Sequence, residues 1–144
     1  MAEAHAAGST TTGLQCVIVT PERAVLDQAC DFVALPMFDG ELGVLPGRVP
    51  MIGRLGFGEL RTGQGTRAQR YYIDGGFVQI HGNVVTVLTP KALKADEIKV
   101  AAVEASMQAL KAVATDDAID AQLKSLDRAR AQLRVAKKAA DDHA

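Results

Sequence analysis

The chain has 144 residues, of which 48% are hydrophobic, 4% aromatic and 23% charged, and its formal net charge is −1. This is the composition of a globular domain, alone or with a small appendage, and the small net charge gives no basis for nucleic acid or an anionic membrane as a partner. No apolar run approaches the roughly 20 residues that a membrane helix needs, so we expect any membrane association to be indirect.

The first 13 residues are small and polar. They contain neither a basic cluster nor an apolar segment, so we expect a flexible tail at 1–13 rather than a secretory signal. From residue 14 to 90 the chain is rich in Val, Ile, Gly and Pro, and short apolar runs alternate with turn residues. These runs predict strands at residues 14–20, 23–27, 31–35, 42–45, 58–61, 69–73, 76–80 and 84–89.

Strong turn signals separate the strands. They occur at Pro36, Asp39-Gly40, Pro46-Gly47 and His81-Gly82-Asn83. We expect the first to end its strand and the last to form a tight hairpin turn, because Gly and Asn adopt positive φ. Many short strands without helices between them predict a two-layer antiparallel β-sandwich, or a flattened barrel, at 14–90.

From residue 91 to 144 the composition changes to Ala, Lys, Asp and Glu, which predicts an antiparallel α-helical hairpin. Asp96 is expected to cap a first helix whose apolar side carries Ile98, Ala101, Ala102, Ala105, Ala109, Leu110 and Val113. A break at residues 115–117 precedes a second helix, whose apolar side carries Ile119, Leu123, Leu126, Ala129, Leu133 and Ala136. An alanine seam buries little area but favours helix, so the two helices could part and stay helical; a static hairpin fits the same sequence.

Residues that could catalyse a reaction or bind a metal are sparse. His5, His81 and His143 are far apart in the sequence, and Cys16 and Cys30 lack the paired spacing of a metal site. The two cysteines could form a disulfide, although two thiols without an export signal are more often reduced core residues. We therefore expect no catalytic residue, no metal and no cofactor.

Four segments carry a resemblance to a known family. They are VTPER (19–23), ALP (34–36), DGELGVLPG (39–47) and DGGFVQIHGNVVTVL (74–88). With these segments the chain resembles the epsilon subunit of the rotary ATP synthase, called delta in mitochondria, from about residue 14 to 93 and more loosely through the helical tail. The resemblance implies a non-catalytic central-stalk subunit at the cytoplasmic face of the inner (plasma) membrane. It would couple the gamma subunit to the c ring, during proton or sodium flow, and regulate ATP hydrolysis through its hairpin. The alternative is a stand-alone β-sandwich binding module with an Ala-rich helical interaction tail.

The resemblance also assigns contact residues. It places Asp39, Gly40, Glu41 and Leu42 on a loop that faces the c ring. Arg48, where the family usually has His, is assigned to the gamma subunit.

The helical part carries two further assignments. Some family members bind ATP through an acid and an arginine in the first helix, but this chain has Lys99 and Ala102 there. Arg130 and Arg134 of the second helix still resemble the arginines of those members and are candidate ATP contacts. Together with Arg128 they also imply attraction to the alpha/beta catalytic subunits, through acidic beta segments, when the hairpin extends. An ordinary solvated charged face is the alternative.

Overall fold

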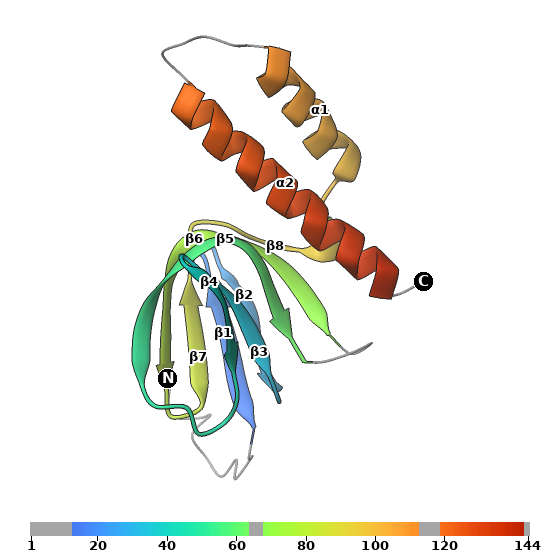
Figure 1. The fold of residues 1–144 in the computed structure, drawn as a ribbon. Coiled ribbons are helices and arrows are strands. Elements are labelled where there is room, and N and C mark those ends of the chain that lie inside the picture. The colour runs from blue at the N-terminus through green and yellow to red at the C-terminus, as the bar shows by residue number, and fades with distance from the viewer. Residues whose placement is uncertain (1–12, 64–67, 113–118, 143–144) are drawn as a thin grey trace.

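The computed structural model describes residues 13–63, 68–112 and 119–142. In this part of the chain a β-domain is followed by two packed helices (Figure 1). The strands are β1 (Leu14–Val19), β2 (Ala24–Cys30), β3 (Val33–Met37), β4 (Gly40–Val44), β5 (Met51–Thr62), β6 (Gln69–His81), β7 (Val84–Leu88) and β8 (Ala92–Lys94). A short 3₁₀ helix, η3 (Ala95–Glu97), precedes α1 (Val100–Ala112) and α2 (Ile119–Asp142).

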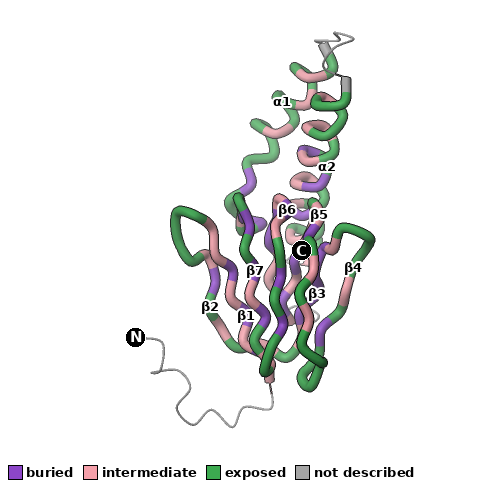
Figure 2. The backbone as a smooth tube through the Cα atoms, turned by 90° about the vertical axis from the view of Figure 1, so that its left-hand side faces the viewer, coloured by how far each residue is buried: buried purple, intermediate pink, exposed green. Residues whose placement is uncertain are grey.

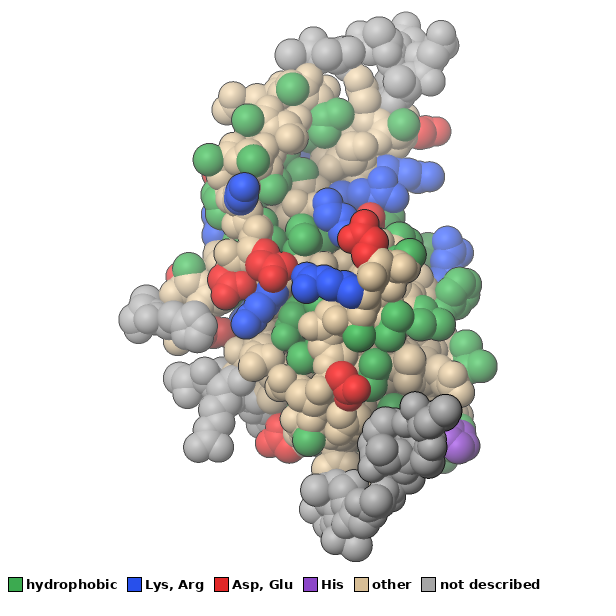
Figure 3. All heavy atoms as spheres, turned by 180° about the vertical axis from the view of Figure 1, so that it is seen from behind, with side chains coloured by type: hydrophobic (Ala, Val, Ile, Leu, Met, Phe, Trp, Pro, Cys, Tyr) green, Lys and Arg blue, Asp and Glu red, His purple; other side chains and the backbone are tan. Residues whose placement is uncertain are grey.

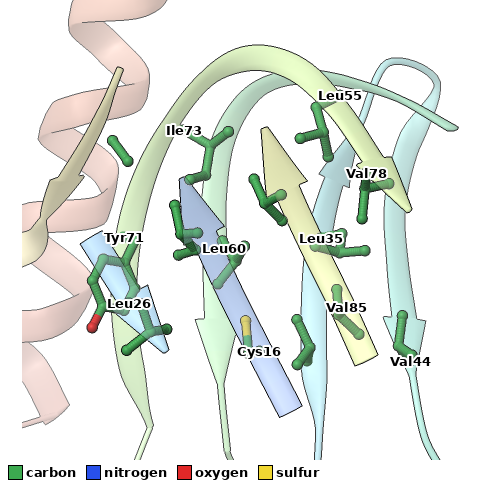
Figure 4. Close-up of a cluster of buried hydrophobic side chains, with 14 of the residues drawn as sticks. Cys16, Leu26, Leu35, Val44, Leu55, Leu60, Tyr71, Ile73, Val78 and Val85 are labelled. Carbon is green, nitrogen blue, oxygen red and sulfur yellow. The ribbon is translucent and has the colours of Figure 1, made fainter. Parts of the chain in front are cut away.

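The described strands form one sheet with the order β2-β1-β7-β6-β5-β3-β4, and β8 pairs with β6. Neighbours run antiparallel except β1 and β7, which are parallel. The long strands β5 and β6 arch over the core, so two parts of the same sheet face each other across it (Figure 4). The predicted β-sandwich followed by a helical hairpin is therefore confirmed, with one parallel pair that the sequence did not predict.

Alternate side chains of the strands point into the sandwich. On β1, for example, Leu14, Cys16 and Ile18 are buried while the residues between them are partly exposed. The core cluster comprises Leu14, Cys16, Ile18, Leu26, Val33, Leu35, Val44, Leu55, Leu60, Tyr71, Ile73, Val78, Ile80, Val85, Val87 and Ala92 (Figure 4). Every member lies between residues 14 and 92, so among the described residues this core contains no side chain of α1 or α2.

Pro36 does not end its strand, contrary to the expectation from sequence. It lies inside β3 opposite Glu41 of β4, and the pairing of β3 with β5 shifts register between Ala34 and Met37. Proline has no N–H to donate, so a strand tolerates it where the hydrogen-bond ladder is interrupted. The irregularity beside β5 provides such a position, and β3 continues to Met37.

The strand predicted at 58–61 is much longer, because β5 begins at Met51. Gly53 and Gly56 lie within β5 and allow β3 to approach closely. A Cβ atom on Gly56 would lie 3.0 Å from the carbonyl oxygen of Met37, and one on Gly53 would collide with the Met37 side chain. These glycines therefore serve strand packing rather than a turn.

The two strands predicted at 69–73 and 76–80 are one continuous strand, β6. Gly75 and Gly76 have φ of 76° and 105°, which bends β6 while Gly76 remains paired with Leu55 of β5. A Cβ atom on Gly76 would collide with the carbonyl oxygen of Leu88 and lie 2.9 Å from Cα of Thr89. Only glycine fits this bend.

The predicted hairpin turn between β6 and β7 is confirmed. Gly82 and Asn83 have φ of 57° and 62°, the two positive values of a type I′ turn. Gly40, in the predicted Asp39-Gly40 turn between β3 and β4, also has a positive φ, of 140°.

The chain stays in the sheet beyond Pro90, where the sequence predicted helix. β8 pairs with β6, and η3 follows it directly. Asp96 lies within η3, so it does not cap α1, which begins at Val100. A strand of three residues is too short for alternation to reveal it.

Helix α1 is mostly exposed (Figure 2). The alanines predicted to form its apolar side, Ala101, Ala102, Ala105 and Ala109, face solvent, and Val103, Met107 and Leu110 are the partly buried residues. These three larger side chains follow helical spacing and bury more area than alanine, so they decide which face turns inward. Val113 and the predicted break at 115–117 lie outside the described residues.

Helix α2 packs on the sheet and η3 as well as on α1 (Figure 1). Its Ala131 and Val135 join Tyr72, Ala95 and Ile98 in a second buried cluster. The predicted apolar side is only partly right: Ala129 is buried, but Leu123 is 53% exposed. Neither α1 nor α2 combines the length and the apolar character needed to cross a membrane.

Neighbouring tyrosines on β6 face different cores. Tyr71 belongs to the sandwich core, whereas Tyr72 lies under α2 in the second cluster. Their opposite directions follow from the period of two along a strand.

Candidate partner-binding surfaces

The described residues bring no metal-binding set together: no three of their His, Cys, Asp or Glu side chains converge. His81 is exposed at the end of β6, while His5 and His143 lie outside the described residues. Cys16 and Cys30 are free thiols. Burial raises the pKa of Cys16 to about 12 and also raises that of Cys30, so both thiols are protonated and weakly nucleophilic at neutral pH.

The outer surface of β5, β6 and β7, together with the adjoining β3–β4 turn, carries several exposed apolar side chains. We call this the outer apolar face; it comprises Phe38 (68% exposed), Ile52 (75%), Phe77 (58%) and Leu88 (54%). Phe77 lies opposite Leu88 on one side and Arg54 on the other, and the N–H of Phe38 donates to the carbonyl of Arg54 at 2.9 Å. Hydrophobic side chains gather along one side of the sheet region in Figure 3. A contiguous exposed apolar patch marks an interaction surface.

The β3–β4 turn borders this face. Asp39, Gly40 and Glu41 are exposed, as a contact loop requires, whereas Leu42 is half-buried and packs against the sandwich core. The guanidinium carbon of Arg54 lies 4.6 Å from the centre of the Phe38 ring. Phe38 was not among the residues singled out from sequence; a lone aromatic beside an Asp-Gly turn was the available signal.

Arg48 lies at the opposite end of β4 from this turn. It follows Gly47, whose N–H donates to Oδ1 of Asn83 at 2.8 Å and so ties the β4–β5 loop to the β6–β7 turn. Its neighbours Leu45 and Val49 are 59% and 73% exposed. The structure therefore separates Arg48 from the Asp39–Leu42 segment.

The three arginines of α2 do not form one surface. Arg128 faces the sheet, with Cζ 4.5 Å from the centre of the Phe57 ring and Nε 3.0 Å from Oδ1 of Asp74. Arg130 has a 53% exposed side chain, 3.7 Å from Asp127. Arg134 lies one turn beyond Arg130 on the same side of the helix, is exposed, and lines a crevice between α2 and the sheet.

That crevice has a volume of about 250 Å³ and separates α2 from β3, β4 and β5. The crevice is lined by Gly40 and Glu41 of β4, by Glu59 of β5, and by Arg134 and Lys138 of α2. The structure thus brings two residues assigned to the c ring next to one assigned to the beta subunits. The sequence did not predict this proximity.

A second pocket, of about 160 Å³, lies between the helices and the β8–η3 segment. It contains Lys99 and Ala102, which stand where the ATP-binding family members have an acid and an arginine, together with Glu97, Ser106 and Gln132. Neither Arg130 nor Arg134 lines it. The structure therefore does not bring the second-helix arginines to the place where the first-helix motif would hold a nucleotide.

Comparisons with known proteins agree with one another. Residues 13–95 match the family described as ATP synthase, Delta/Epsilon chain, beta-sandwich domain. An ATP synthase epsilon chain of Rhodopirellula baltica is 59% identical over 83 residues, which cover 58% of this chain and 65% of that relative. One of Lawsonia intracellularis is 37% identical over 99 residues, covering 69% of this chain and 74% of the relative. The match to the first relative thus spans just under two thirds of its length.

Solved structures share the fold over more of the chain. A chain in the mitochondrial ATP synthase of Euglena gracilis (OSCP/F1/c-ring) superposes with a TM-score of 0.67 at 19% identity, covering 91% of this chain and 81% of that one. A chain in the central stalk/c-ring structure of the Tetrahymena thermophila enzyme superposes with a TM-score of 0.59 at 12% identity, covering 85% of this chain and 96% of that one. At this identity the superpositions concern the fold alone.

Proposed function

This chain belongs to the delta/epsilon family of ATP synthase subunits, and from that membership we propose that it is a central-stalk subunit that couples the gamma subunit to the c ring. The match of residues 13–95 to the family's β-sandwich domain carries the proposal. In this role the chain has no catalytic activity of its own. It is held at the cytoplasmic face of the membrane through the complex.

The exposed surfaces of the sandwich support a division of contacts. The outer apolar face suits a large protein partner, because partly exposed aromatic and aliphatic side chains are typical anchors of stable interfaces. We assign it, with Arg48 and its exposed neighbours Leu45 and Val49, to the gamma subunit. We assign the polar tip of the β3–β4 turn, Asp39–Glu41, to contact with the c ring.

Reconstitution tests this function. Membrane vesicles whose ATP synthase has been stripped of its epsilon subunit should regain ATP-driven ion pumping when the full chain is added. A chain ending at Lys99 should also restore pumping, because the sandwich core contains no helix residue. If the hairpin acts as a brake, only the full chain should slow ATP hydrolysis.

Two outcomes would redirect the proposal. Failure of the full chain to bind the stripped enzyme, with its circular dichroism spectrum unchanged, would favour a stand-alone binding module. Equal hydrolysis rates with the full chain and the shortened one would remove the regulatory part and leave the coupling role.

Nucleotide binding is expected to be weak. Lys99 and Ala102 replace the acid and arginine of the ATP-binding members, and the second-helix arginines do not line the pocket between the helices. Calorimetry with ATP should give a dissociation constant of about 1 mM or weaker. Micromolar binding that is lost in Arg130→Ala or Arg134→Ala would contradict this and show that binding requires those arginines.

A further inference from the structure

Helix α2 is attached to the sheet by two arginine–carboxylate contacts, one near its middle and one at its C-terminal end. We propose that these contacts form a polar clamp, Arg128 with Asp74 and Arg70 with Asp142, which sets the equilibrium between docked and released α2. The inference concerns the isolated chain and does not rest on the proposed function.

The first contact combines a ring and a carboxylate. The Arg128 guanidinium stacks over Phe57, and its Nε lies 3.0 Å from Oδ1 of Asp74. The two groups form an ion pair but not a hydrogen bond, because the Nε–H does not point at the oxygen. Phe57 and Asp74 are partners in the β5–β6 register, so they present one surface to the helix. The Tyr72 hydroxyl donates to the same Asp74 oxygen at 3.2 Å and orients the carboxylate. Burial, with the Asp74 charge, raises the pKa of Tyr72 and keeps this donor protonated.

The second contact holds the end of the helix. Arg70 of β6 donates from Nε to Oδ2 of Asp142 at 2.6 Å, and from an Nη atom to Oε1 of Glu59 at 2.6 Å. The side chains of Arg70 and Glu59 are only 12% and 11% exposed, so this is a largely desolvated charged network. A carboxylate in the last turn of a helix opposes the helix dipole, and Arg70 offsets that effect at Asp142.

The apolar contact between the two points is small. The helix contributes Ala131 and Val135 as its fully buried members, with Ala136 and Ala139 packed at the side. Alanine removes little apolar area from water, so we expect the charged contacts to add measurably to the docking free energy that burial of Val135, Tyr72 and Ile98 supplies. Because the Arg128 side chain is 43% exposed, its ion pair with Asp74 should weaken with ionic strength, so docking of α2 should be salt-sensitive while the sandwich core is not.

Hydrogen exchange of the full chain tests the clamp. Arg128→Gln should speed exchange of the α2 amides by about tenfold and leave those of β1 and β7 unchanged. Arg130→Gln is a matched control: it makes the same change two residues away, where the side chain is 53% exposed and its ion pair, with Asp127, lies within the helix. It should change exchange by less than about twofold. Asp142→Asn should act like Arg128→Gln at the other end.

Salt provides an independent measurement on the unmodified chain. Raising the ionic strength should speed exchange of the α2 amides in the unmodified chain. The same increase should have a smaller effect in Arg128→Gln, because that variant has already lost one charged contact. Equal α2 exchange in the two arginine variants would overturn the clamp and assign docking to the apolar cluster. If Arg128→Gln also speeds amide exchange in β1 and β7, the variant has lost stability as a whole, and the salt measurement on the unmodified chain then tests the clamp. Exchange of the α2 amides that does not change with salt would overturn the proposal.

Discussion

Replacing Gly76 with alanine is expected to lower the free energy of unfolding and the thermal midpoint of the protein strongly. The residue has φ of 105°, and its Cβ would collide with the carbonyl oxygen of Leu88, a backbone atom that cannot move away alone. Backbone strain and overpacking together should cost about 3–5 kcal/mol. That is a large part of the roughly 5–15 kcal/mol that stabilises a typical domain, so thermal unfolding followed by circular dichroism should show a much lower midpoint.

Gly82→Ala separates the two causes. Gly82 also has a positive φ, of 57°, but nothing lies within 4 Å of the position its Cβ would take. This variant should lose only about 1 kcal/mol. If both variants lose the same stability, the collision with Leu88 is not decisive and the bend of β6 is more adaptable than the structure indicates.

Leu88→Asp is expected to abolish stable binding to the gamma subunit while leaving the fold intact. Leu88 is 54% exposed and lies beside Phe77 within the outer apolar face, so the substitution puts a charge where the proposed interface excludes water. Loss of an interface anchor costs about 2 kcal/mol or more, which weakens affinity by at least about thirtyfold. Surface plasmon resonance with immobilised gamma subunit would measure the change.

Leu123→Asp is the matched control. Leu123 has nearly the same exposure, 53%, but lies on α2, outside the sheet. It should bind gamma like the unmodified chain. Equal affinities of all three proteins would remove the outer apolar face from the interface and shift attention to Arg48 and its loop.

The fold was predictable from sequence where a residue pattern is compatible with only one kind of local structure. The apolar run at 14–20 predicted the strand that the structure shows as β1, and Gly82-Asn83 predicted the tight turn between β6 and β7. Glycine was a less specific signal, because it serves a tight turn at Gly82 but close strand packing at Gly53 and Gly56. Alanines were ambiguous in another way, because they occur on several faces of α1 and so do not indicate which face is buried.

The candidate surfaces were predictable only in part. The family resemblance led to the exposed Asp39–Glu41 tip, because a turn can be recognised locally. The outer apolar face could not be found this way. Ile52 and Phe77 become neighbours of one surface only through the β5–β6 register, and without it an exposed apolar residue looks like a core residue. Asp74 was likewise unremarkable until α2 placed Arg128 against it.

The opposite directions of Tyr71 and Tyr72 give the protein two internal reporters. The chain contains two tyrosines and no tryptophan, so its near-ultraviolet signal comes largely from these adjacent residues. In a Tyr72→Phe protein the remaining tyrosine, Tyr71, reports on the sandwich core. In a Tyr71→Phe protein the remaining tyrosine, Tyr72, reports on the cluster between the sheet and α2. Lifting of the helix and melting of the sandwich can thus be followed as separate spectroscopic events, without attaching a dye.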